Sequence, residues 1–165
     1  TEEVTGGKAD ILIATLGKSL GVNGGYVVAS TKVIYYLRET SPFYIYSNPI
    51  TPAEAAASLA ALHILDSDEG LKLLEKLRSL SAFLRSGLKS LGYETLSGEH
   101  PIVPVFIRDT QLTSALVKHL FEHGILTTGL NFPVVPKGEQ EIRLQVNADH
   151  TEKDLSFLLD NFSKF

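Results

Sequence analysis

Two short apolar runs near the start of the chain, Ile11–Ala14 and Gly25–Ala29, limit most strongly what this sequence can fold into. Each run has the length and composition of a strand, and a loop with three glycines, residues 15–24, separates them. Two strands and one loop cannot bury both of their faces alone. We therefore expect this pair to be the end of a larger sheet.

The stretch after these strands predicts helices. A short helix is expected over residues 31–38, followed by irregular or extended chain over 41–49, which prolines bracket. The next helix has a clear beginning, because Thr51 is a good N-cap, Pro52 suits the first helical position and Glu54 completes a capping box.

The second half of the chain predicts a small α+β domain. Leucines recur at helical spacing, and Gly92 ends this helix as a C-cap. We interpret the leucine stripe as core packing. It consists of Leu71, Leu74, Leu77, Leu80, Leu84, Leu88 and Leu91. We further predict strands over 102–107, 125–128 and 141–146, a helix over 113–123 closed by Gly124, and a last helix capped by Thr151. These elements predict an antiparallel sheet with helices on one face, and a domain boundary near residues 66–70.

Composition excludes several classes of function. The chain has 165 residues, 44% of them hydrophobic and 21% charged, as in globular proteins. A net charge of -4 without a basic stripe argues against a nucleic-acid partner, and no apolar run approaches the ~20 residues that span a bilayer. Without cysteine there are no disulfides or thiolate metal sites. The N-terminus lacks the basic start and apolar middle of a signal peptide, and we expect a cytoplasmic protein. Because the chain does not begin with an initiator Met, we expect a fragment or a processed product.

Lys18 lies in the glycine-containing loop directly after the first predicted strand, and its local residues leave three interpretations open. Gly17-Lys18-Ser19 matches the end of a phosphate-binding P-loop, but that motif needs a glycine where this chain has Leu12. The lysine could instead form a Schiff base, which requires a partly deprotonated amine. The third interpretation is an ordinary surface lysine.

Several spaced motifs resemble the α-oxoamine synthases, pyridoxal-phosphate (PLP) enzymes of the aspartate-aminotransferase fold type I. The cofactor-lysine segment of that family is similar to residues 15–21 followed by Gly24-Gly25-Tyr26. Further matches follow in the family's order over nearly the whole chain: Ser41-Pro42, Tyr46-Ser47-Asn48, residues 133–138, Ile142-Arg143 and His150-Thr151. Within the family, the Ser-Asn pair and residues 133–138 look most like the 2-amino-3-ketobutyrate CoA ligases (glycine C-acetyltransferases).

This resemblance implies a role for each matching residue. Lys18 would carry PLP as a Schiff base and later move the α-proton of the bound amino acid. Thr15 would give its hydroxyl to the PLP phosphate, and Ser47 and Asn48 would reach the cofactor of a neighbouring subunit, so the active site would be shared across a homodimer. Arg143 would bind the substrate carboxylate, which suits the bidentate fork of a guanidinium. The cofactor-binding set is Thr15, Leu16, Gly17, Lys18, Ser47 and Asn48.

The resemblance also implies a fold and an activity. Residues 1–68 would be the C-terminal end of the large PLP-binding domain, and residues 69–165 the small C-terminal α+β domain. The full-length enzyme would be a PLP-dependent acyl-CoA:amino acid C-acyltransferase that joins glycine to an acyl-CoA. The alternatives are a PLP-dependent aminotransferase and a non-catalytic C-terminal module for dimerisation or binding.

Four features depart from the family pattern or stand outside it. The stretch Asn147-Ala148-Asp149-His150 replaces a small Ser-Ala-Ala-His motif, and the loop after Lys18 is slightly short, so both could alter substrate choice. The family's pyridine-nitrogen aspartate and ring-stacking histidine lie upstream of this chain, so we expect the fragment alone to be inactive. His119 and His123 have zinc-ligand spacing but lack a third ligand, and we predict no metal site.

Overall fold

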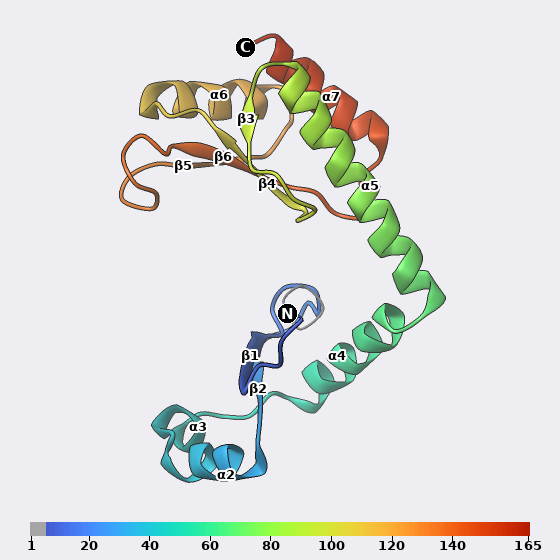
Figure 1. Ribbon diagram of the computed structural model, residues 1–165, viewed down its shortest axis with the longest axis vertical. Helices are drawn as coiled ribbons and strands as arrows, with labels where there is room; N and C mark the ends of the chain where they lie inside the picture. Colours follow the sequence, from blue (N-terminus) through green and yellow to red (C-terminus); the bar gives the residue numbers. More distant parts are fainter. Residues whose placement is uncertain (1–5) are drawn as a thin grey trace. The chain divides into compact units, whose positions relative to one another are not determined.

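The computed structural model describes residues 6–165, whose contacts divide the chain into two units (Figure 1). The first unit extends to Gly70 and the second covers Leu71–Phe165. Helix α5 (Asp68–Ser90) begins at this boundary.

The first unit contains a two-stranded antiparallel sheet and three helices. Its elements are β1 (Ile11–Thr15), β2 (Gly25–Ala29), α2 (Thr31–Thr40), α3 (Pro42–Tyr46) and α4 (Pro52–Leu65). Both strands and the capping box of Thr51 and Glu54 are confirmed. The prediction of irregular chain over residues 42–46 is wrong, because Pro42 occupies the first turn of α3, where its fixed φ and missing N–H suit a helix start.

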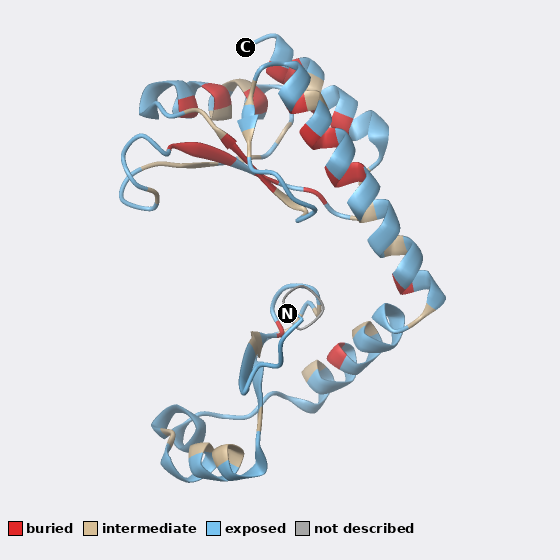
Figure 2. Ribbon diagram, viewed as in Figure 1, coloured by how far each residue is buried: buried red, intermediate tan, exposed pale blue. Residues whose placement is uncertain are grey.

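Neither face of the β1–β2 sheet is buried by other described residues of this unit. Neighbouring residues of a strand point to opposite faces, yet Leu12 and Ile13 are 36% and 74% exposed and Val28 is 56% exposed. Within residues 6–70 only Leu16, Ser58 and Gly70 are buried (Figure 2). The pair is therefore not a self-sufficient sheet.

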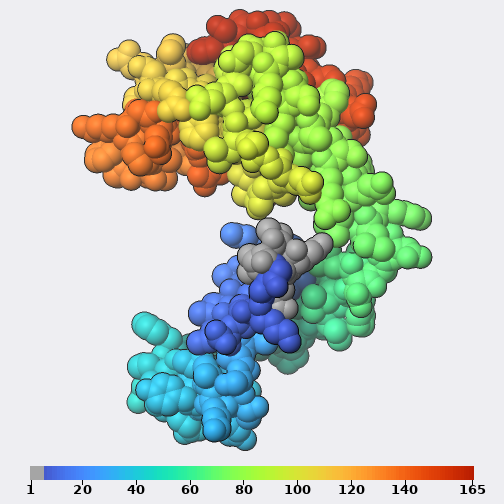
Figure 3. All heavy atoms as spheres, in the orientation of Figure 1, coloured from blue at the N-terminus to red at the C-terminus, as the bar shows by residue number. Residues whose placement is uncertain are grey.

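The second unit is a four-stranded antiparallel sheet with three helices on one face (Figure 1). Its strands follow the order β3-β4-β6-β5 and are β3 (Glu94–Thr95), β4 (Ile102–Phe106), β5 (Thr128–Leu130) and β6 (Glu141–Gln145). The helices are α5, α6 (Thr110–Glu122) and α7 (Glu152–Ser163). This arrangement agrees with the predicted small α+β domain. The segment between β5 and β6, orange in Figure 3, stands at the surface of this unit.

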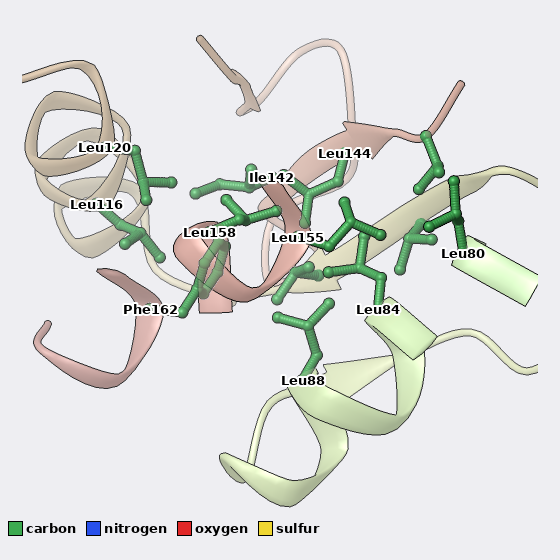
Figure 4. Close-up of a cluster of buried hydrophobic side chains, with 13 residues drawn as sticks. Leu80, Leu84, Leu88, Leu116, Leu120, Ile142, Leu144, Leu155, Leu158 and Phe162 are labelled. Atoms are coloured by element: carbon green, nitrogen blue, oxygen red, sulfur yellow. The ribbon is translucent and has the colours of Figure 1, made fainter. Parts of the chain in front are cut away.

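Successive side chains of the central strands β4 and β6 point to opposite faces of the sheet, and the core lies on the face that the helices cover. Val103 and Val105 of β4 and Ile142 of β6 are fully buried, while Arg143 between the buried residues of β6 is exposed. Leucines of all three helices meet these strands (Figure 4); those in the core are Leu80, Leu84, Leu88, Leu116, Leu120, Leu155 and Leu158, with Phe162.

Four points of the sequence analysis of the second unit need correction. The leucine stripe is core only in part, because Leu71, Leu74 and Leu91 are 64%, 40% and 39% exposed. The strand predicted over residues 125–128 begins only at Thr128, since the Ile125 amide donates to the Leu120 carbonyl (2.9 Å) and closes α6. Strand β3 was not predicted, and α6 begins before the predicted residue 113 because Asp109 caps it.

Candidate active site

Strand β1 carries the chain directly into the loop that contains Lys18. The Leu16 amide donates to the Gly24 carbonyl (2.9 Å) and the Val22 amide donates to the Leu16 carbonyl (3.2 Å), so Leu16 closes the base of the loop. Leu16 is also buried, with 7% of its surface exposed. Lys18 is exposed between these anchoring points, and its carbonyl accepts from the Gly21 amide (3.1 Å).

Gly24 is required at the other end of this loop for two reasons. Its φ of +99° lies in the left-handed region, which side chains with a Cβ disfavour. A Cβ there would also collide with the Ile50 side chain. The loop is thus fitted closely against the segment that leads into α4.

Glu54 ties the Lys18 loop to the start of α4. Its Oε1 accepts from Asn23 Nδ2 (3.0 Å), and its Oε2 accepts from the Thr51 amide (2.7 Å). The bond from the Thr51 amide, with the bond from Asn23 second, holds the pKa of Glu54 below its usual value. Asn23 and Glu54 line a cavity of about 320 Å³ together with Gly17, Gly21 and Val22.

A larger cavity of about 680 Å³ lies between the sheet of the first unit and helices α2 and α3. Most of its lining is apolar, but its residues include Arg38, with a guanidinium, and four with hydroxyl-bearing side chains: Thr15, Tyr26, Ser41 and Tyr44. Hydroxyls and a guanidinium are donors that suit a phosphate. The site residue Thr15 therefore belongs to a cavity whose polar groups could accept a phosphorylated ligand.

Ser47 and Asn48 lie in the exposed segment between α3 and α4. Ser47 is the C-cap residue of α3, with extended backbone (φ −105°, ψ 157°). The two residues belong to the same unit as Thr15 and Lys18.

Arg143 belongs to the second unit, on the sheet face opposite the helices. Its partners in register are Pro104 of β4 and Thr128 of β5. The guanidinium makes an ion pair with Glu141 (Nη2 to Oε1, 2.7 Å), and the two side chains are 49% and 8% exposed. A half-exposed arginine at this position can still contact a ligand.

The two units thus hold different parts of the predicted site. Residues 15–18 are consecutive at the end of β1, and Ser47 and Asn48 follow in the same unit, while Arg143 lies in the other. Sequence reasoning missed the cavity residue Arg38 and the contact of Glu54 with Asn23. Glu141 was also missed, although its spacing of two residues from Arg143 on a predicted strand was a usable signal.

The His119–His123 pair is occupied by bonds to the backbone. His119 Nε2 lies 3.1 Å from the Asn161 carbonyl, and His123 Nδ1 lies 2.8 Å from the His119 carbonyl, so each of these nitrogens donates to a carbonyl. Among residues 6–165, no three His, Cys, Asp or Glu side chains form a group that could hold a metal ion. No helix in that part of the chain is both long and apolar enough to cross a membrane.

Comparison with known proteins gives a match along almost the entire chain. Residues 2–162 match the family model for Aminotransferase class I and II. The chain is 40% identical over 159 residues to 8-amino-7-oxononanoate synthase of Thermosipho melanesiensis, and 35% identical over 159 residues to 2-amino-3-ketobutyrate coenzyme A ligase of Salmonella typhimurium. These alignments cover 96% of this chain, which spans 40% and 39% of the length of these two relatives.

Solved structures match the fold just as fully. A serine palmitoyltransferase of Sphingomonas wittichii superposes with a TM-score of 0.85 at 25% identity. A variant of SPT with PLP superposes with a TM-score of 0.87, also at 25% identity. Both alignments cover 94% of this chain and 39% of the other.

Proposed function

The chain belongs to the aminotransferase class I and II family, and from this premise we propose that it is the cofactor-lysine and substrate-arginine part of a PLP-dependent acyl-CoA:amino acid C-acyltransferase. The predicted resemblance to the α-oxoamine synthases is confirmed by the two relatives. The predicted fold class, the end of a PLP-transferase large domain followed by a small α+β domain, is also confirmed. The family and the PLP-containing neighbour indicate PLP as the cofactor.

The observation that carries the proposal is the position of Lys18. Lys18 follows Thr15, which is exposed at the end of β1, and Leu16, which is buried. Backbone hydrogen bonds of Leu16 close the loop, and the close fit of Gly24 against Ile50 restrains its other end. A lysine in such a loop can present its amine to a ligand that the strand end holds. The hydroxyl of Thr15 would bind the phosphate, and Ser47 and Asn48 would do so from a second subunit of a homodimer.

The residues of this chain would have separate roles in the reaction. Bound PLP would supply an electron sink for the α-carbon of the amino acid. The Lys18 amine would hold the cofactor and then take the α-proton. Arg143 would hold the substrate carboxylate and so orient the α C–H bond for that transfer. The net reaction joins the amino acid to the acyl group of an acyl-CoA and releases CoA and a 2-amino-3-keto product.

For the substrates, we propose glycine and an acyl-CoA, as implied by the resemblance of residues 133–138 and of the Ser47-Asn48 pair to the ligases. The relatives include both a ligase and a synthase, so the acyl and amino acid substrates have to be measured. Assays of CoA release from several acyl-CoAs, each with glycine, alanine and serine, would identify the preferred pair. Transfer of the amino group to a 2-oxo acid without CoA release would instead support the aminotransferase alternative.

The first experiment tests the lysine. The purified chain and the full protein that carries it are titrated with PLP, reduced with borohydride and mapped by peptide mass spectrometry. We expect one adduct, on Lys18, and its loss in Lys18→Ala but not in Lys8→Ala, which changes another exposed lysine of the same unit. Adducts spread evenly over surface lysines in the full protein would contradict the proposal. An adduct in the full protein but not in the isolated chain would support the non-catalytic alternative for the chain alone.

A further inference from the structure

Glu141 is a nearly buried carboxylate beside the arginine that is proposed to bind substrate. Only 8% of its side chain is exposed, and its Oε1 accepts from both Nε (3.2 Å) and Nη2 (2.7 Å) of Arg143. The two residues are two apart on β6, so their side chains emerge on the same face of the sheet. The pair is therefore built into a strand and is not a chance surface contact.

The backbone of Glu141 is held from both sides. In the register of the sheet, Glu141 pairs with Phe106 of β4 and with Leu130 of β5. Strand pairing on each side restrains the backbone of Glu141, and its side chain, which is only 8% exposed, has little room to move. Arg143 has a long side chain that is 49% exposed and would otherwise sample many rotamers.

The contact uses one edge of the guanidinium and leaves another edge open. An arginine has five N–H groups. Glu141 takes the Nε–H and one N–H of Nη2, which together form the side edge of the fork. The Nη1–Nη2 end of the fork keeps one N–H on each nitrogen directed outward, which is enough for a bidentate bond to a second carboxylate.

We propose that Glu141 is a positioning residue that locks Arg143 by its Nε edge, so that the substrate carboxylate binds to the outer Nη1–Nη2 edge in one orientation. This inference rests on the proposed role of Arg143 as the substrate-carboxylate ligand. Because Glu141 also balances the charge of Arg143, the attraction to an incoming carboxylate is smaller than for a free arginine. Selection of the amino acid then depends on the geometry of the fork more than on net charge.

The test measures steady-state kinetics in the full protein that carries this chain, with Glu141→Ala, Glu141→Gln and Arg143→Ala. Loss of the anchor in Glu141→Ala should raise KM for the amino acid about tenfold, the scale of one hydrogen bond to a charged group, while KM for the acyl donor stays unchanged. Glu141→Gln keeps an acceptor oxygen and should restore most of the affinity. Glu139→Gln makes the same chemical change at an exposed position and should have no effect.

A spectroscopic signal separates positioning from folding. The Nε–H of Arg143 should give a protected, shifted ¹⁵N signal in the unsubstituted protein and in Glu141→Gln, and that signal should move to the free-arginine position in Glu141→Ala. An unchanged Nε–H signal in Glu141→Ala, or a KM for the amino acid that falls or stays the same, would overturn the inference. If Arg143→Ala itself leaves that KM unchanged, the proposed substrate role of Arg143 fails instead, whatever Glu141 does.

Discussion

Arg85 is a buried cation of the second unit whose hydrogen-bond partners among the described residues are backbone carbonyls. It is 8% exposed, and its guanidinium donates to the carbonyls of Leu96, His100 and Ile102, which lie before and at the start of β4. Its Nη1 is buried without a partner among the described residues. One side chain thus fixes the loop between β3 and β4 to helix α5.

We predict that Arg85→Lys destabilises the second unit by about 1–3 kcal/mol, because an ammonium lacks the planar fork that reaches all three carbonyls and leaves at least one of them without a donor. Urea unfolding followed by circular dichroism would measure this loss. Arg78→Lys is the matched control on the same helix, since the Arg78 side chain is 63% exposed, and its cost should stay within about 0.5 kcal/mol. Equal effects of the two substitutions would contradict a special role for Arg85.

A second residue-scale prediction concerns how the contribution of Glu54 to stability depends on pH. Bonds from Thr51 and Asn23 hold its folded-state pKa below the usual value, so its contribution to stability is complete above the pKa of the unfolded chain. That contribution is lost as the pH falls through the lowered folded pKa. Carbon-13 NMR titration should find the Glu54 carboxyl titrating below its value in the unfolded chain, and Asn23→Ala should move its midpoint upward. A Glu54 midpoint that is the same in the folded and the unfolded chain would show that these bonds do not form in solution.

The sequence predicted those contacts that join residues close together in the chain, and it did not predict those that join residues far apart in the chain. The capping box of Thr51 and Glu54 spans three residues, so its spacing alone predicts it. The second bond of Glu54 reaches Asn23, 31 residues away, and only the fold brings the two together. The contacts of Arg85 with carbonyls 11 to 17 residues away have the same tertiary origin.

Helix α5 shows which leucines of a periodic stripe matter at the scale of an element. Leu84 is fully buried, whereas Leu74 on the same helix is 40% exposed. Gly87 lies on the same helix where a Cβ would collide with Leu159 of α7, so the two helices pack very closely. Periodicity predicted the helix but could not distinguish leucines that meet the sheet from those that do not.

We therefore predict that Leu84→Ala costs about 2–5 kcal/mol of unfolding free energy in the second unit, through lost burial and the cavity that remains. Leu74→Ala should cost about 1 kcal/mol or less, since that side chain is already partly in water. Denaturant midpoints of the two variants would give the comparison. A cost for Leu74→Ala as large as that for Leu84→Ala would mean that Leu74 is buried in solution.

Short elements were the least predictable. Helix α3 has five residues and strand β5 has three, so neither is long enough to establish a hydrophobic period. The longer elements α4, α5 and α7 were recognised from caps and periodicity. The positions that the resemblance assigns to the cofactor lie in loops, where motifs were informative and periodicity was not.

At the scale of the whole molecule, the two units differ in how much core they contain. Thirteen buried residues form the core cluster of the second unit, while both faces of the first unit's sheet are exposed. We predict that residues 68–165 expressed alone, with α5 complete, unfold cooperatively in urea, because their core is self-contained. Residues 1–67 alone should show weak amide protection in hydrogen exchange. Strong protection in the isolated first unit would show that its exposed sheet finds sufficient packing within itself.

The proposed sharing of the active site between subunits makes a prediction that only the assembled protein can test. Suppose that Ser47 and Asn48 of one subunit complete the site that contains Lys18 of the other. In a mixed dimer, one subunit carries Lys18→Ala and the other carries Ser47→Ala and Asn48→Ala. All of these substitutions then fall in one of the two sites, and the other site is intact. Random mixing of two inactive proteins should then restore about a quarter of the original CoA release, because half of the dimers are mixed and each has one complete site. Sites that do not cross the interface would recover nothing, since every site in the mixture would carry one damaging substitution. Sequential affinity purification on two different tags, one on each subunit type, would show that mixed dimers form, so a failure to recover activity would count against sharing and not against exchange.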